Sequence, residues 1–239
     1  MRVVGVHRSI LAAALMALAG TVAVTGIRTA AVAAEDKQEG VRDILFDSDH
    51  LKTVSEGAQL KYKFDRIVSE PKLLGPAFSD EIEVDVAKAN AEGKHEVGVK
   101  IFTGERARDP RQLGGMTANP LLVFYLDRAI SNYATLAGGS KGYLKNRFRL
   151  ALRTTAKIEP VKVAYNGKTV DGYHVWVAPY VNDPNKEKMQ GYQGSRFDVY
   201  VSDQVPGYLV ELNSKFESSE PSAPKLDERI VLHGAEVKK

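Results

Sequence analysis

The stretch ANPLLVFYLDRAISNYATLAGG, residues 118–139, has the start and stop signals of a helix. Asn119 is a favoured N-cap, Pro120 suits a first helical turn, and two glycines end the pattern. We therefore predict a helix over residues 119–138. At about 100° per residue, most of its apolar side chains form one broad stripe that would seat it on a sheet. The stripe consists of Leu122, Val123, Leu126, Ala129, Ile130, Tyr133, Leu136 and Ala137.

The first two turns of this helix carry three further apolar side chains outside the stripe, Leu121, Phe124 and Tyr125. A surface helix needs only one apolar face, so this surplus predicts that a second element covers the start of the helix. We expect that element to be the 103–117 loop or the turn near His50. The alternative is that these side chains are exposed and form a contact surface for a partner or a membrane.

Segments on both sides of the helix alternate apolar and polar residues, which predicts β-strands with one dry face. Alternation after the helix also predicts a strand near residues 147–153, and Asn166-Gly167 predicts a hairpin turn. We expect a short capped turn within 46–57, loops over 103–115 and 181–194, and a Ser/Pro linker at 217–225. The apolar positions before the helix are Leu60, Tyr62, Phe64, Ile82, Val84, Val86, Val97, Val99 and Ile101.

The number of strands decides the predicted shape. A flat sheet of eight strands would be about 38 Å wide at about 4.8 Å per strand, whereas a helix covers about 10–12 Å. One helix cannot keep such a face dry, so the sheet must curl. We predict a mainly β (α+β) fold: a strongly curved antiparallel sheet or half-barrel of about 8–10 strands, with the long helix packed across it. Whether a packed core or a cavity lies beneath the helix stays open.

The N-terminal segment has the layout of a secretory signal peptide. Arg2 and Arg8 precede an apolar run over residues 10–27, and Ala31-Val32-Ala33 suits a cleavage site. We predict cleavage after residues 1–33, a lead-in over 34–58, a single β-rich domain over 59–239, and a periplasmic location. The alternative is a retained membrane anchor, since the apolar run approaches a spanning length.

Charge and motifs argue against several function classes. Without the three arginines of residues 1–33, basic residues equal the 30 acidic ones, so a general nucleic-acid role is not expected. The chain contains no cysteine. The GGSKG sequence at 138–142 matches G-x-S-x-G, but a helix precedes Ser140 where that motif requires a strand. DSDH at 47–50 fits a capped turn better than a metal site. We expect no catalytic residue, metal or cofactor, and a non-enzymatic protein.

Two segments carry a resemblance to a known family, NGKTVDGYHVWV at 166–177 and RFDVYVSDQVPGYLVELNSKF at 196–216. A G-x-x-V-x-G hairpin followed by a strand, a Pro-containing turn and another strand resembles the lipoprotein-carrier (LolA/LolB-like) superfamily of periplasmic proteins. The resemblance covers about a third of the mature chain. It implies a curved sheet capped by helices, with an apolar interior that can hold an acyl chain.

The pattern and the resemblance together give a predicted ligand site. We expect an apolar ligand, a lipid, an acylated molecule or another hydrophobic small molecule, in a carrier or envelope-maintenance role. The alternative is a structural or interaction protein of the cell envelope with a filled core and an envelope protein partner. Arg106, Arg108 and Arg111 share one loop and are candidates for contact with an anionic headgroup or partner. The predicted pocket is lined by Tyr62, Phe64, Val84, Val97, Val99 and Phe148 from the sheet, and by Leu122, Leu126, Ile130 and Tyr133 from the helix.

Overall fold

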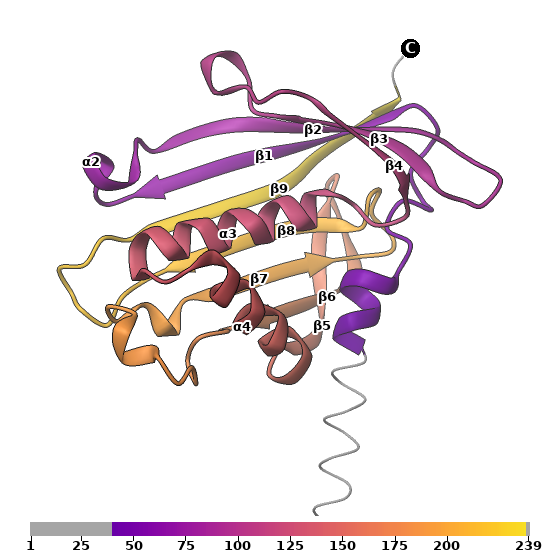
Figure 1. The fold of residues 1–239 in the computed structure, drawn as a ribbon. Helices are drawn as coiled ribbons and strands as arrows, with labels where there is room; N and C mark the ends of the chain where they lie inside the picture. The colour runs from indigo at the N-terminus through magenta and orange to yellow at the C-terminus, as the bar shows by residue number, and fades with distance from the viewer. Residues whose placement is uncertain (1–39, 238–239) are drawn as a thin grey trace, which may run out of the picture. The chain divides into compact units, whose positions relative to one another are not determined.

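The computed structural model describes residues 40–237, which form a mainly β structure (Figure 1). The predicted signal peptide at 1–33 and the start of the 34–58 lead-in lie outside the described residues. Within residues 40–237, nine antiparallel strands form an open, curved sheet in the order β4-β3-β2-β1-β9-β8-β7-β6-β5. The predicted mainly β class, the antiparallel curved sheet and the count of about 8–10 strands are confirmed for this part of the chain.

The sheet consists of two meanders, which meet in the middle of the sheet where β1 pairs with β9. The first runs from β1 to β4 and the second from β5 to β9, and β1 pairs with β9 along its whole length, for example Phe64 with Ile230. The strands are β1 (Ala58–Val68), β2 (Phe78–Ala89), β3 (His95–Ile101), β4 (Arg111–Met116), β5 (Lys157–Tyr165), β6 (Lys168–Val177), β7 (Arg196–Val201), β8 (Leu209–Phe216) and β9 (Leu226–Val237).

The alternation in the sequence becomes one dry and one wet face of the sheet. Leu60, Tyr62 and Phe64 of β1 are buried, as are their counterparts in β2 and β3. The residues between them face water and pair across strands. Lys100 of β3, for instance, lies opposite Glu83 of β2 and binds its carboxylate at 2.7 Å. The burial of one face requires a cover, which two helices provide.

The first of these helices, α3 (Leu121–Ala137), lies where a helix is predicted. The Asn119 side chain accepts a hydrogen bond from the Leu121 N–H at 3.1 Å, and Gly138, with φ of +78°, ends the helix. Gly can adopt this left-handed conformation without the strain that a Cβ brings. One residue of the predicted stripe is misplaced, because Val123 is 58% exposed.

The prediction of one helix and a strand near 147–153 is wrong, because these residues belong to a second helix, α4 (Lys141–Thr154). Ser140 is its N-cap, accepting a hydrogen bond from the Tyr143 N–H at 3.3 Å. The buried residues Leu144, Phe148, Ala151 and Leu152 recur at helical spacing, whereas Leu150 is 40% exposed. Phe148 therefore reaches the core from a helix, where its ring lies edge-on to that of Phe197 in β7, with centroids 4.8 Å apart.

Two smaller predictions also need correction. The expected 103–115 loop contains the edge strand β4, which pairs with β3 although its side chains are largely exposed. The expected turn within 46–57 begins earlier, as η1 (Asp43–Asp47), and continues only as turns and bends. The remaining helices are short: α2 (Pro71–Leu74), η2 (Gly104–Arg106), η3 (Lys186–Lys188) and η4 (Tyr192–Gly194). Among the described residues, no helix has both the length and the apolar character needed to cross a bilayer.

Candidate functional site

The ten residues predicted to line a pocket lie in one continuous core. Leu126 is partly buried and the other nine are buried. α3 contributes Leu122, Leu126, Ile130 and Tyr133, the strands contribute Tyr62, Phe64, Val84, Val97 and Val99, and α4 contributes Phe148.

Three of these core residues, Leu122, Leu126 and Phe148, line a region with little free space. Where α3 and α4 meet β6 and β7, the free space is about 10 Å³, with Leu122, Phe148 and Phe197 among its walls. A space of that size holds about one water molecule. In this conformation, therefore, side chains fill the region between the helices and this part of the sheet.

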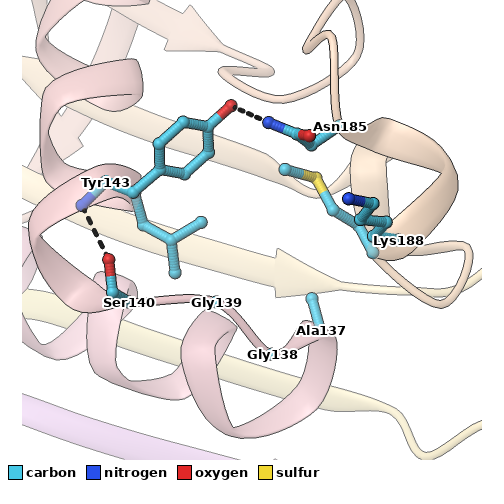
Figure 2. A pocket seen from close by; sticks show the side chains of 9 residues that line it. Ala137, Gly138, Gly139, Ser140, Tyr143, Asn185 and Lys188 are labelled. Atoms are coloured by element: carbon cyan, nitrogen blue, oxygen red, sulfur yellow. Dashed lines mark hydrogen bonds between the residues drawn. The ribbon is translucent and has the colours of Figure 1, made fainter.

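A larger cavity, of about 410 Å³, lies at the junction of α3 and α4 (Figure 2). One wall comes from the end of α3, the 138–140 turn and the first turn of α4, and the other from η3 and the residues on either side of it. Its volume falls in the range of small-molecule sites, about 300–1,000 Å³. The lining residues are Ala137, Gly138, Gly139, Ser140, Tyr143, Leu144, Asn185, Lys188 and Met189.

The buried carboxylate of Asp183 holds the two walls together. It accepts hydrogen bonds from the Tyr143 hydroxyl at 2.7 Å, the Asn185 N–H at 2.8 Å and Arg147 Nε at 2.6 Å. Asn185 Nδ2 in turn donates to the Tyr143 hydroxyl at 2.9 Å (Figure 2). Desolvation by burial acts to raise the pKa of Asp183, but the hydrogen bonds from Tyr143, Asn185 and Arg147 outweigh it and lower that pKa.

An aromatic group connects this cavity to the core. The Tyr133 hydroxyl, from the middle of α3, contacts Met189 Sδ at 3.1 Å. Its ring packs on Tyr180 with centroids 4.0 Å apart, and the Tyr180 hydroxyl donates to the Leu144 carbonyl at 3.3 Å. Burial raises the pKa of both phenols, so they stay neutral hydrogen-bonding groups. Tyr133 is thus a predicted pocket residue that touches a wall of the observed cavity.

The polar groups at the cavity combine a cation with neutral side chains. Lys188 is exposed, and in the part of the chain that the structure describes its amine forms no ion pair. Tyr143, Asn185 and Ser140 are neutral, and none of the residues that line the cavity is acidic. Within residues 40–237, no cluster of side chains has the composition of a metal site.

The sequence analysis missed this cavity because it predicted a strand near 147–153, soon after the end of the helix, and a loop over 181–194. Residues 147–152 read RFRLAL, and this alternation is typical of a strand. The same region also has Leu144, Phe148 and Leu152 at intervals of four residues, which is typical of a helix. The signal for a helix was Ser140 as an N-cap. Residues 181–194 carry no periodic pattern from which the position of Asn185 or Lys188 could be predicted. They lie near α4 because Asp183 binds the Tyr143 hydroxyl, a contact that depends on the tertiary structure.

The start of α3 is covered, as the apolar surplus predicts. Leu121 and Tyr125 are buried, so the alternative of an exposed contact surface is wrong for these two residues. The turn at His50 lies against this end, with the Asn119 N–H donating to His50 Nδ1 at 3.3 Å. Phe124 is half-buried, and its ring lies edge-on to Phe102 at 6.4 Å.

The three arginines predicted to act as surface contacts differ in their surroundings, because one is held in an ion pair and two are exposed. Arg106 binds the Asp80 carboxylate at 2.8 Å and lies over the Phe78 ring at 4.9 Å, so it has a structural role in the hairpin. Arg108 and Arg111 are exposed, and Arg111 begins β4. A contact of these two with an anionic headgroup or partner stays a prediction.

Comparison with known proteins finds no related sequence and a few loosely similar structures. No family model matches the chain. No curated protein sequence matches it either. Among solved structures, it is similar to the Mycobacterium tuberculosis lipoprotein LppX, with 12% identity over 84% of this chain and 97% of that one and a TM-score of 0.31.

Two further structures are similar to this chain. One is a DUF1329 family protein from Desulfovibrio piger, with 8% identity over 84% of this chain and 93% of that one and a TM-score of 0.29. The other is the LolA superfamily protein NE2245 from Nitrosomonas europaea, with 9% identity over 85% and 94% and a TM-score of 0.22. Identities of 8–12% and TM-scores of 0.22–0.31 are a loose likeness of fold and assign no family or role to the chain.

Proposed function

We propose that the protein binds an apolar ligand, a lipid or an acylated molecule, in the cavity at the junction of α3 and α4. The observation that carries the proposal is the cavity of about 410 Å³, with Ala137, Leu144 and Met189 as apolar walls and a few polar groups at its edge. This combination of apolar walls and a small number of polar groups is typical of small-molecule sites. The proposed site thus differs from the pocket beneath α3 that the sequence suggested.

The neighbouring contacts support a preformed site. Asp183 fixes Tyr143 and Asn185 on opposite walls, and Tyr133 supports Met189 from the core. A ligand entering such a cavity needs little reordering of side chains, so less of its binding free energy is lost.

We propose a binding role and not a catalytic one. The Ser140 hydroxyl accepts the Tyr143 N–H as a helix cap, and the Tyr143 proton is directed to Asp183. Ser140 has no histidine or carboxylate beside it in the cavity lining as described, and the Asp183 carboxylate beside Tyr143 is paired with Arg147. We further propose that the protein is exported to the periplasm, on the signal-peptide layout of residues 1–33.

The second candidate is a structural or interaction protein of the cell envelope with an envelope protein partner. The packing between the helices and the sheet favours this candidate. Where α3 and α4 meet β6 and β7, the free space is only about 10 Å³. If this candidate is right, the cavity at the helix junction is an incidental surface hollow and has no measurable affinity for apolar molecules.

Fluorescence titration of residues 34–239 with the neutral probe N-phenyl-1-naphthylamine separates the two candidates. We expect saturable binding that is weakened by Lys188→Trp, because this exposed residue lines the cavity and a large ring there fills it. Lys186→Trp is the matched control, from the same short helix but outside the lining, and should bind as the parent does. Absence of saturable binding to the parent protein, together with no lipid retained on gentle extraction from its own host, would leave the structural candidate.

A further inference from the structure

The edge of the cavity carries mainly hydrogen-bond donors that are free to bind a ligand. Lys188 carries an ammonium with three N–H groups, and no ion pair within the described residues engages it. Asn185 uses one N–H of its amide on the Tyr143 hydroxyl, which leaves the second for a ligand. Figure 2 shows Asn185 and Lys188 on the wall that faces Tyr143.

The surrounding charges leave this edge positive. Asp183, the buried acid next to the lining, is paired with Arg147 at 2.6 Å. On η3, Glu187 is flanked by Lys186 and Lys188, and all three are exposed. Asn185 also offers a carbonyl oxygen, but that oxygen carries no formal charge. The ammonium of Lys188 therefore favours an anion over a neutral or cationic group at the mouth of the cavity.

We propose that the ligand is a single-chain amphiphile with an anionic end, a carboxylate or a phosphate. Lys188 and Asn185 bind the anionic end at the edge, and the apolar chain lies against Ala137, Leu144 and Met189. This inference rests on the proposed function and adds the chemical class of the end group and the residues that recognise it.

Displacement of N-phenyl-1-naphthylamine by four ligands with the same twelve-carbon chain tests the inference. They are dodecanoate, dodecyl phosphate, dodecanol and dodecyltrimethylammonium. We expect the two anions to displace the probe at the lowest concentrations, and their relative affinities to distinguish a carboxylate from a phosphate. Their advantage over dodecanol should decrease with added salt, because an exposed charge pair is screened.

Charge variants of Lys188 identify the residue that acts. Lys188→Gln should weaken dodecanoate binding about fivefold relative to dodecanol binding, which corresponds to an exposed ion pair of about 1 kcal/mol. Lys188→Arg should retain the preference, and Lys186→Gln, outside the lining, should not alter it. Equal affinities for anion and alcohol in the parent protein, with no effect of Lys188→Gln, would overturn the inference and leave the proposed function standing. Loss of the proposed function would show instead as no displacement by any of the four.

Discussion

The Arg128 guanidinium of α3 donates two hydrogen bonds to the Glu228 carboxylate of β9, at 2.7 Å from Nε and 2.6 Å from Nη2. Arg66 of β1 and Asn132 of α3 donate to the same carboxylate. Glu228 is 3% exposed and Arg66 is 8% exposed, so the cluster is shielded from water. One buried carboxylate thus joins α3 to the two central strands of the sheet.

Removing that carboxylate should strongly destabilise the fold. Glu228→Ala leaves the buried Arg66 and the partly exposed Arg128 without their acid, and we expect a loss of about 3–5 kcal/mol in the free energy of unfolding, mainly from Arg66. Urea denaturation measures this. The matched control is Glu211→Ala in β8, whose bidentate pair with Arg229 lies at the surface and should contribute under about 1 kcal/mol. Similar losses for both variants would contradict the role given to Glu228.

Phe148 and Leu150 distinguish a helix from a strand over residues 141–154. In a strand the two side chains would share a face, whereas in α4 Phe148 is buried and Leu150 is 40% exposed. Phe148→Ala should therefore cost about 3–5 kcal/mol of stability, and Leu150→Ala about 0.5 kcal/mol or less. Thermal unfolding of the two variants provides the test, and equal losses would favour the strand.

Asp183 should stabilise the cavity walls in a pH-dependent way. Its pKa is lowered in the folded protein, so its contribution is fully present above the unfolded pKa of about 3.9. That contribution disappears as the pH falls through the lower, folded value. We expect Asp183→Asn to cost about 1–3 kcal/mol at pH 7, and the difference from the parent to shrink below about pH 4.

Urea denaturation at a series of pH values between 7 and 3 measures this difference. The control is Asp127→Asn on α3, because Asp127 is exposed and pairs with Lys145 at 2.9 Å. Its effect should stay under about 1 kcal/mol at pH 7. If Asp183→Asn shows a constant penalty down to pH 3, the ionised carboxylate is not what holds the walls.

Phe124 and Val123 test how the start of α3 is covered. Phe124 is half-buried beside Phe102, and Val123, next to it in the chain, is 58% exposed. Phe124→Ser should cost about 1–2 kcal/mol of stability and Val123→Ser about 0.5 kcal/mol or less. Differential scanning calorimetry of both variants checks this. If Phe124→Ser is as stable as the parent protein, the side chain does not support the fold, and it becomes a candidate for contact with a partner or a membrane.

Several features could be predicted from local sequence because they depend on residues close in the chain. Leu60, Tyr62 and Phe64 alternate with charged neighbours, and one burial face of β1 follows directly from that period of two. Asn119 and Gly138 lie at the two ends of α3 because capping depends on the adjacent turn. Around Phe148 the local pattern fitted both a helix and a strand, and the contact with Phe197 was not visible in it.

The sequence by itself determined the fold class, the antiparallel strands with one dry face, and the helix at 121–137, because backbone geometry converts short-range patterns into local structure. Only the tertiary structure decided the pairing of β1 with β9, the second helix and the position of the cavity. The reason is that these features depend on contacts between distant residues. Asp183 meets Tyr143 across forty positions, and Glu228 meets Arg128 across a hundred. Side chains fill the region where α3 and α4 meet β6 and β7 for the same reason, since its packing depends on which distant side chains converge there.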